Sequence, residues 1–174
     1  MRVIGGEFRS RRLKSVPGEA TRPTPDRLRE TLFDILTPRI EGATFVDAYA
    51  GTGAVGIEAL SRGARHAYFL EKNRVALEAI RENLAALKVE DRATVLTGPV
   101  AVTISRVAAE ADIIFADPPY TAGREYGVLF ESLAGATGLV VVQHSMRMPL
   151  PESWRVARTV RQGENVLAFL EGGW

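Results

Sequence analysis

The feature that most constrains the fold is a regular alternation of short apolar segments with helical segments after residue 43. Short apolar runs of this kind are typical of strands that are buried on both faces. Such strands, when they alternate with helices, form a parallel sheet that is covered by helices on both sides. The expected strands are 44–49, 67–71, 93–97, 112–117 and 139–143, and the expected helices are 54–62 and 73–87.

The two ends of the chain add other elements to this sheet. Segments 155–160 and 165–170 flank a turn at Gly163 and predict an antiparallel hairpin at one sheet edge. Residues 1–16 indicate a short β-ribbon, and an extended stretch is expected from Pro17 to Pro23. We therefore expect an α/β protein with a doubly wound, mostly parallel sheet and an antiparallel end. Its residues 1–40 would form a ribbon-and-helix extension packed on a main domain of residues 41–174.

Local signals mark the first helix. Thr24 is expected as its N-cap and Pro25 as its first helical residue, and Asp26 then lies where the helix dipole favours a carboxylate. Pro38 is expected to end this helix. The helix over 73–87 is expected to bury one side, made of Val75, Ala79, Leu84 and Leu87.

Basic side chains are concentrated in the first thirty residues. This segment holds eight basic and four acidic side chains, whereas the whole chain has 22 and 21, so the remainder is net negative. A basic head on a mildly acidic body indicates contact with a polyanion, although a solvated surface segment is an alternative of equal weight.

Composition excludes several kinds of site. There is no cysteine, and therefore no disulfide, thiolate metal site or cysteine nucleophile. Only His66 and His144 could supply imidazole ligands, so we expect no metal. The chain has no apolar run near the ~20 residues that cross a bilayer and no secretory signal, which predicts a cytoplasmic protein.

A glycine pattern follows the first expected strand. Gly51, Gly53 and Gly56 have the spacing G-x-G-x-x-G, and Glu71 ends the next strand. The glycines let the backbone approach a nucleoside closely, and the acid can accept hydrogen bonds from ribose hydroxyls. Because a nicotinamide dinucleotide would fit equally well, the pattern alone leaves an oxidoreductase module open.

Asp47 favours a different nucleoside. A dinucleotide places its pyrophosphate at the helix N-terminus, where a carboxylate would repel it. S-adenosylmethionine carries an ammonium and a sulfonium group instead, so Asp47 would attract it. The plainer alternatives are that Asp47 only caps local backbone and that Glu71 is an ordinary surface acid.

The segment Asp117-Pro118-Pro119-Tyr120 follows the expected strand 112–117, at the sheet edge where doubly wound folds bind ligands. The prolines carry no N–H, so the Asp117 carboxylate and the Pro118 carbonyl present only acceptors. Together they can accept both N–H groups of a base amino group and direct its lone pair toward the sulfonium methyl. Tyr120 offers a stacking face for a flipped-out base. A rigid turn is the plainer alternative, and an adenine-N6 methyltransferase also remains open.

These residues resemble the RsmD-like 16S rRNA guanine-N2 methyltransferases, over nearly the whole chain. The head from Arg2 to Leu13, RVIGGEFRSRRL, is similar to that family's M-R-I-I-x-G-x-x-R-G-R-x-L. The segment from Thr21 to Phe33 is similar to its R-P-T-x-D-R-V-R-E-x-L-F. The resemblance implies a Rossmann-like fold, S-adenosylmethionine as methyl donor and one guanine of small-subunit rRNA as target. It further suggests an assembled or partly assembled subunit as substrate, and a monomer is the simplest expectation.

The resemblance also implies roles for individual residues. Asp47, Gly51 and Gly53 would hold the methionine end, Glu71 the ribose, and Asp117 to Tyr120 the guanine amino group. The expected cofactor-binding residues are Thr24, Asp47, Ala48, Tyr49, Gly51, Gly53, Glu71, Lys72, Gly98 and Asp117. The expected catalytic residues are Asp117, Pro118, Pro119 and Tyr120, and the expected RNA-binding residues are Arg9, Arg11, Arg12, Lys14 and Arg22.

Two positions depart from the family pattern. Gly98-Pro99 stands where the family usually has a small residue followed by an acid for adenine, so adenine is expected to find other, backbone partners. Gln143-His144 stands where a glutamate is common, and a satisfied sheet-edge histidine is expected more than a site residue. A non-catalytic RNA-binding protein is a further alternative, against which the intact D-P-P-Y argues.

Overall fold

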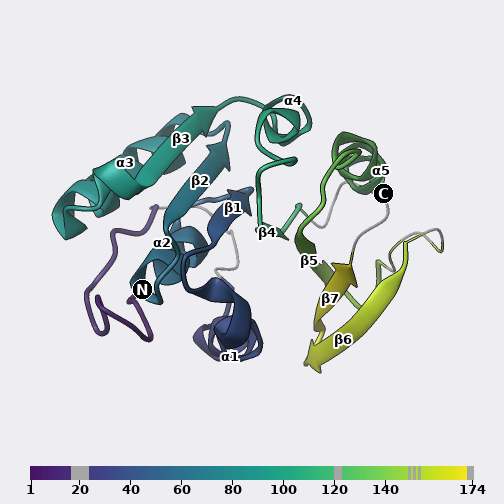
Figure 1. Cartoon of the computed structure of the whole chain (residues 1–174), viewed down its shortest axis with the longest axis horizontal. Coiled ribbons are helices and arrows are strands. Elements are labelled where there is room, and N and C mark those ends of the chain that lie inside the picture. The colour runs from purple at the N-terminus through teal and green to yellow at the C-terminus, as the bar shows by residue number, and fades with distance from the viewer. Residues whose placement is uncertain (17–23, 120–122, 149, 151, 153, 172–174) are drawn as a thin grey trace.

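A seven-stranded sheet forms the centre of the computed structural model, which describes residues 1–16, 24–119, 123–148, 150, 152 and 154–171. The strand order is β3-β2-β1-β4-β5-β7-β6 (Figure 1). Strands β1 to β5 are parallel, and β7 pairs antiparallel with both β5 and β6. The strands are β1 (Thr44–Ala48), β2 (His66–Glu71), β3 (Ala93–Thr97), β4 (Ile113–Ala116), β5 (Leu139–Ser145), β6 (Val156–Gln162) and β7 (Asn165–Glu171). The expected α/β class and the C-terminal hairpin are confirmed.

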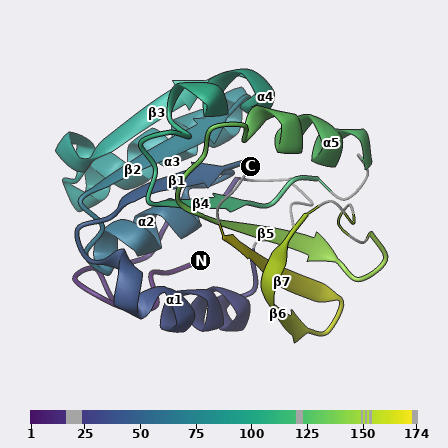
Figure 2. The same ribbon diagram turned by 45° about the vertical axis from the view of Figure 1, so that its right-hand side comes forward.

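Helices cover both faces of this sheet, as Figure 2 shows for α1 and α2 on one side and α4 and α5 on the other. The first face carries α1 (Asp26–Ile40), α2 (Ala54–Ser61) and α3 (Arg74–Leu87), and the second carries α4 (Val100–Thr103) and α5 (Gly123–Ser132). Short 3₁₀ turns at Glu90–Arg92 and Ile104–Arg106 precede β3 and follow α4. None of the helices in the described part of the chain is long and apolar enough to cross a membrane.

Alternation along the central strands divides the core between the two faces. Phe45 and Phe115 pack with α1, whereas Val46 and Ala116 pack with α4 and α5. All five residues of β1 are buried, as expected for a strand in the middle of a covered parallel sheet. This alternation places Asp47 on the side of α2, at the C-terminal edge of the sheet.

The boundaries of α1 differ from those expected. The helix begins at Asp26, Pro25 takes the N-cap position, and no side chain caps the helix. Thr24 is therefore not the N-cap: its hydroxyl donates instead to Oε1 of Gln143, at 3.3 Å. Pro38 also does not end the helix, which runs to Ile40. A proline so close to the C-terminus removes one intrahelical donor but has little helix left to disrupt.

The residues expected to be buried on the inner side of α3 are confirmed, except for the first of them. Asn73 is the N-cap, and its side chain accepts hydrogen bonds from the amides of Val75 and Ala76. The buried stripe begins only at Ala76, so Val75 is 51% exposed and its expected burial is wrong. Ala79, Leu84 and Leu87 are buried as expected.

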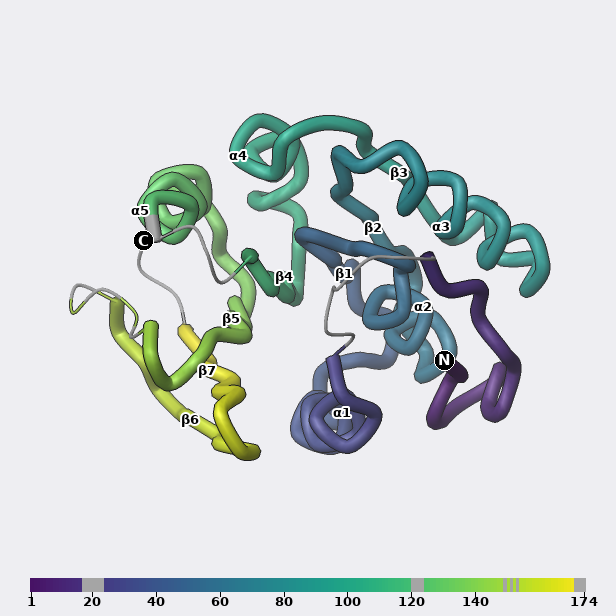
Figure 3. The backbone as a smooth tube through the Cα atoms, turned by 180° about the vertical axis from the view of Figure 1, so that it is seen from behind, coloured from purple at the N-terminus to yellow at the C-terminus, as the bar shows by residue number. Residues whose placement is uncertain are grey.

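The N-terminal residues form a short ribbon that lies beside α2 and α3 (Figure 3). Arg2 and Arg12 form an antiparallel bridge, and the amide of Leu13 donates to the carbonyl of Met1 at 3.0 Å. Val3, Phe8 and Leu13 are buried in the core formed with α2, β2 and α3. The segment 17–23, expected to be extended, lies outside the described residues.

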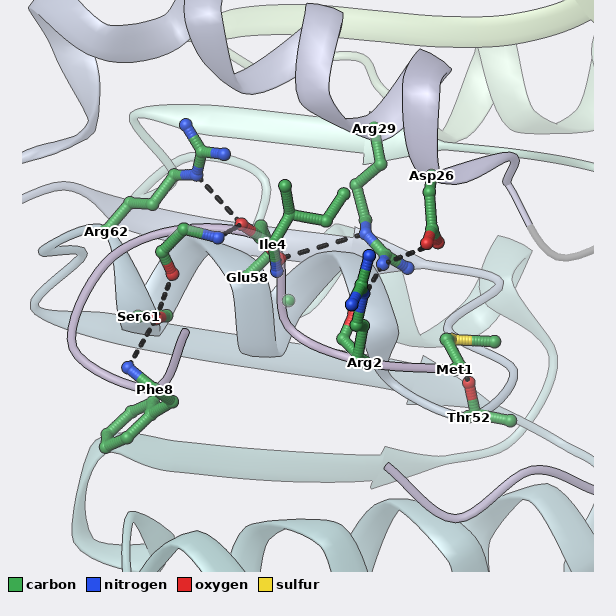
Figure 4. Close-up of polar contacts among 12 residues, drawn as sticks. Met1, Arg2, Ile4, Phe8, Asp26, Arg29, Thr52, Glu58, Ser61 and Arg62 are labelled. Atoms are coloured by element: carbon green, nitrogen blue, oxygen red, sulfur yellow. Dashed lines mark hydrogen bonds and ion pairs between the residues drawn. The ribbon is translucent and has the colours of Figure 1, made fainter. Parts of the chain in front are cut away.

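A buried carboxylate on α2 anchors this ribbon (Figure 4). Glu58 accepts hydrogen bonds from the amides of Ile4 and Gly5, at 2.9 and 2.8 Å, and from Nε of Arg62 at 2.9 Å. Nε of Arg29, in α1, lies 3.8 Å from the same carboxylate. Glu58 and Arg29 are 0% and 1% exposed, and burial lowers the pKa of Arg29. The ribbon, α1 and α2 thus meet at one buried charged pair.

Candidate active site

A cavity of about 760 Å³ opens at the C-terminal ends of the parallel strands. Four segments of the sheet domain form its wall: the turn after β1, the end of β2, the loop after β3, and the end of β4 with the start of α5. Met1 and Thr24 complete the wall from the N-terminal side. The strand order places these segments together because β1, β2 and β4 are neighbours that run in one direction.

The turn after β1 is shaped by glycines with different tasks. Gly51 has φ 55°, lines the cavity, and has open space where a Cβ would stand. Gly53 has φ 80°, and a Cβ there would lie 3.3 Å from Ile80 and Phe69. A Cβ on Gly56 would lie only 2.4 Å from the Phe69 ring. Gly51 therefore leaves room for a ligand, whereas Gly53 and Gly56 allow the turn and the packing of α2 on β2.

Asp47 is buried directly beneath this turn. Its Oδ2 accepts a hydrogen bond from the amide of Gly56 at 2.8 Å. Burial raises the pKa of Asp47 well above its ordinary value; the Gly56 bond opposes this, and the nearby Glu71 and Asp117 add to it. The residue both holds local backbone and lines the cavity, so the capping role and the ligand role are compatible.

Glu71 ties the end of β2 to the same turn. Its Oε2 accepts from the amide of Gly51 at 2.9 Å, and its Oε1 accepts from the amides of Lys72 and Asn73 at 2.8 Å each. Each carboxylate oxygen has further acceptor capacity that can face a ligand hydroxyl. Glu71 is therefore a positioned group of the cavity wall rather than a free surface acid.

Asp117 follows β4 on the opposite side of the cavity. Burial raises the pKa of this carboxyl to about 7. Pro118 is buried and Pro119 exposed, and both line the cavity beside Asp117. Tyr120 lies outside the described residues, so the stacking face expected there stays a prediction.

The structure places most expected cofactor residues in the cavity wall. Thr24, Asp47, Tyr49, Gly51, Glu71, Lys72, Gly98 and Asp117 line it. Ala48 is fully buried in the core and Gly53 faces Phe69, and neither belongs to the wall. Gly98 has φ 143° and donates its amide to the carbonyl of Glu71 at 3.0 Å, which brings the loop after β3 against β2.

Several wall residues were not expected from the sequence. Val100 and Ala101 of α4 add an apolar surface beside Gly98. Arg124, Glu125 and Val128 come from α5, a helix that is not among those expected from the sequence. Its buried residues Tyr126 and Leu129, with Leu133 directly after its last residue, recur at helical spacing and are the signal that could have revealed it.

Tyr49, directly after β1, and Glu125, in α5, both line the cavity. Tyr49 has φ 64°, an uncommon backbone conformation for a side-chain-bearing residue. Burial, followed by the charge of Glu125, raises the pKa of Tyr49, so its hydroxyl stays protonated as a donor. Oε2 of Glu125 is buried and has no hydrogen-bond partner among the described residues.

The expected RNA-binding side chains lie on the ribbon. Arg9 and Arg12 are exposed and form no ion pair within the part of the chain that the structure describes. Nη2 of Arg11 donates to the carbonyl of Ala86, and Nζ of Lys14 pairs with Glu82 on α3. Arg22 lies outside the described residues.

His144 has local partners. Its Nδ1 lies 3.0 Å from the carbonyl of Ser145 and 3.1 Å from that of Met148, so it must donate to these two acceptors. The neighbouring Gln143 is 2% exposed and accepts from Thr24. The arrangement is that of a satisfied histidine at the end of β5.

Comparison with known proteins places this geometry in context. The model of a family described as Conserved hypothetical protein 95 matches residues 1–171. A candidate rRNA methyltransferase of Bacillus subtilis is 34% identical over 166 residues, which cover 88% of this chain and 87% of that protein. Ribosomal RNA small subunit methyltransferase D of Escherichia coli is 40% identical over 123 residues, or 71% and 62% of the two chains. The solved structure of a candidate methyltransferase of Escherichia coli has a TM-score of 0.84 at 33% identity and covers 99% of both chains.

Proposed function

This chain belongs to the family described as Conserved hypothetical protein 95, that of the RsmD-like rRNA methyltransferases, and from this premise we propose its reaction. It transfers a methyl group from S-adenosylmethionine to the exocyclic N2 amino group of a guanine in small-subunit rRNA. The observation that carries this proposal is a cavity walled by carboxylates at the glycine turn, next to an Asp-Pro-Pro segment.

The residues of the turn fit a cofactor that has cationic groups and no phosphate. In a dinucleotide site, backbone amides at the helix N-terminus receive the pyrophosphate. Here the amide of Gly56 is bonded to Asp47 and the amide of Gly51 to Glu71. A pyrophosphate would lose these donors and meet two acidic side chains. An ammonium or sulfonium group would instead be attracted to Glu71 and would favour the ionised form of Asp47, whose pKa burial raises. This disfavours a nicotinamide cofactor.

The wall divides into regions that suit the parts of S-adenosylmethionine. Asp47 and the backbone at Gly51 suit the methionine end, and Glu71 suits the ribose hydroxyls. The apolar surface of Val100 and Ala101, with the backbone of Gly98, suits an adenine that lacks an acidic partner. When bound, the cofactor supplies an activated methyl group on its sulfonium sulfur.

Asp117 and Pro118 orient the target base. The carboxylate and the Pro118 carbonyl accept the two N–H groups of the amino group, so the nitrogen lone pair is directed at the methyl carbon. Correct orientation of two reactants can lower a barrier by ~7–11 kcal/mol. The nitrogen loses one proton as its new bond forms. The carboxylate of Asp117, with a pKa raised to about 7 by burial, is placed to take that proton.

The ribbon is the proposed RNA contact. Its exposed arginines Arg9 and Arg12, with Arg11 and Lys14, bind phosphates while the base enters the cavity. Residues 1–40 thus act as an RNA-facing extension of a methyltransferase domain over 41–174. We further propose that the protein acts as a monomer in the cytoplasm, on an assembled or partly assembled subunit.

The proposal is tested by transfer of a labelled methyl group to rRNA and to small subunits from a strain that lacks this protein. Mapping of the labelled nucleotide should find one guanine with a modified N2 group. Asp117→Asn should abolish transfer, and Asp91→Asn, which changes an exposed acid before β3, serves as the matched control. Label on an adenine amino group would refute the guanine assignment, and no transfer to any RNA would refute the proposal as a whole.

A further inference from the structure

Asn83 is a buried amide on α3 that contacts two distant segments of backbone. It is 4% exposed. Its Nδ2 donates to the carbonyls of Lys14 and Thr52, at 3.2 and 3.1 Å, and its Oδ1 accepts from the amide of Lys14 at 2.7 Å. A polar side chain is costly to bury unless it is hydrogen bonded. Loss of either backbone partner would therefore leave a buried amide group of Asn83 unsatisfied.

The first partner is the end of the ribbon. Lys14 follows Leu13, whose amide closes the ribbon onto the carbonyl of Met1. Asn83 bonds both the amide and the carbonyl of Lys14 and thereby fixes where the ribbon ends against α3. The ammonium group of Lys14 pairs with Glu82, one residue before Asn83.

The second partner is the turn that lines the cofactor cavity. Thr52 stands between Gly51 and Gly53, both of which have positive φ, and it lines the cavity. Glu71 holds the amide of Gly51, and Asn83 holds the carbonyl of the next residue. These two side chains fix the turn from two directions, although only Glu71 faces the cavity.

A second contact joins the ribbon to the same turn. The hydroxyl of Thr52 lies 3.7 Å from Sδ of Met1, and Met1 also lines the cavity. Figure 4 shows these two side chains next to one another. Displacement of the ribbon would therefore move Met1, which lines the cavity. It would also disturb Asn83, which binds the carbonyl of Thr52, another residue of the cavity wall. The ribbon and the glycine turn share one set of contacts.

We propose that Asn83 is a positioning residue that couples the RNA-binding ribbon to the cofactor turn, so that each ligand raises the affinity for the other. A ligand that orders the turn also fixes Asn83, and a fixed Asn83 lowers the cost of ordering the ribbon. The effect must be reciprocal, because coupling between two binding sites is a single free energy. The inference rests on the proposed function only in assigning RNA to the ribbon.

The coupling is measured by calorimetry with S-adenosylhomocysteine and unmethylated small subunits, each titrated with and without the other. In the wild type, each ligand should lower the Kd of the other by about five-fold or more. In Asn83→Ala this factor should fall to about one. Asn83→Ala should also weaken S-adenosylhomocysteine in the absence of RNA. A folded Asn83→Ala protein with wild-type coupling would overturn the proposal.

Ser61→Ala is the matched control. The Ser61 hydroxyl also holds the ribbon, since it accepts from the amide of Phe8 at 2.9 Å and donates to the carbonyl of Gly5 at 2.6 Å. Among the described residues it has no hydrogen bond to the turn, and its substitution leaves the bonds of Asn83 to Lys14 and Thr52 in place. Ser61→Ala should therefore weaken S-adenosylhomocysteine binding less than Asn83→Ala does and keep the coupling factor near its wild-type value. An equal loss of that affinity in both variants would point to general destabilisation and overturn the specific role of Asn83.

Hydrogen exchange in the wild-type protein supplies a test without RNA and without substitution. Addition of S-adenosylhomocysteine should slow exchange of the ribbon amides of Val3, Ser10 and Lys14, which are hydrogen bonded in the structure. Unchanged exchange in the ribbon, with protection confined to the cavity, would overturn the coupling. Because no RNA is present, this result is separate from any failure of the proposed RNA contact.

Discussion

Replacement of Glu58 by alanine should destabilise the protein by about 3–5 kcal/mol, the range seen when one member of a buried charge pair is removed. The substitution leaves the guanidinium of Arg29, which is 1% exposed, without its buried carboxylate. It also removes the acceptor for the amides of Ile4 and Gly5. Nε and Nη1 of Arg29 already have no hydrogen-bond partner among the described residues, so little is available to compensate.

The magnitude follows from the bonds that are lost. The two amide-to-carboxylate hydrogen bonds contribute ~1.5–3 kcal/mol each. Ile4 and Gly5 are only half-buried, so water can replace part of this loss, which favours the lower half of the sum. The bond from Nε of Arg62 is lost as well, but Arg62 is partly exposed and keeps Asp34 as a partner, so this loss adds little. Asp26 remains 3.1 Å from Nη2 of Arg29 but is largely exposed and holds the charge weakly. For a chain of this length, 3–5 kcal/mol corresponds to a fall in Tm of roughly 6–20 °C.

Thermal and urea denaturation of four proteins would test this: wild type, Glu58→Ala, Arg29→Met and the double variant. The double variant should be less destabilised than the sum of the single variants, because removal of both charges leaves no isolated buried charge. Glu58→Gln, which keeps the size and one acceptor, should lose less than Glu58→Ala. A loss below about 1 kcal/mol in Glu58→Ala, or strictly additive effects in the cycle, would refute the reasoning.

Four further outcomes are expected. Asp117→Ala should nearly abolish turnover and leave cofactor affinity within a few-fold, as kinetics and calorimetry on one preparation would show; normal turnover would remove this carboxylate from the mechanism. In the wild type, kcat/KM should fall as pH drops below about 7, because the raised pKa of Asp117 makes its acceptor form dominant only above that pH; a flat profile down to pH 5 would contradict this role. Tyr120→Phe should retain most activity, whereas Tyr120→Ala should lose at least ~1 kcal/mol of transition-state stabilisation, and equal losses would show that the hydroxyl matters. Joint replacement of Arg9, Arg11 and Arg12 by alanine should flatten the salt dependence of RNA binding by about two to three log–log units without changing cofactor affinity; an unchanged slope would mean that these side chains only solvate the surface.

The elements of the fold could be predicted from the sequence wherever a local residue pattern is sufficient to determine the secondary structure. The parallel strands were expected because short, largely apolar runs such as 93–97 leave few other structures available, and β3 has those bounds although it is only half-buried at the edge of the sheet. The ends of α1 were misplaced because local capping rules do not include tertiary partners: Thr24 bonds Gln143, 119 residues away in sequence. The omission of α5 is of another kind, because its buried residues Tyr126 and Leu129 recur at helical spacing and could have indicated a helix.

The part of the site that follows the C-terminal ends of the parallel strands could be predicted from the sequence. Asp47, Glu71 and Asp117 were expected near one another because the carboxyl ends of adjacent parallel strands meet at one edge. Glu58 and Asn83, by contrast, look like polar residues of helix surfaces in the sequence, and only the packed ribbon shows why both are buried. Interactions between segments far apart in sequence have no local signature.

The anchoring of the ribbon also sets an order of events during synthesis. The side chains that bind its backbone come later in the chain: Ser61 lies 53 residues after Phe8, and Asn83 lies 69 residues after Lys14. At about 5–20 residues per second, translation needs roughly 3–14 s to supply them after the ribbon has been made. During that interval a short arginine-rich peptide is exposed beside the translating ribosome, whose surface is itself polyanionic. The nascent protein is thus basic and unanchored first, and acquires its buried Glu58 and Asn83 contacts only when α2 and α3 emerge.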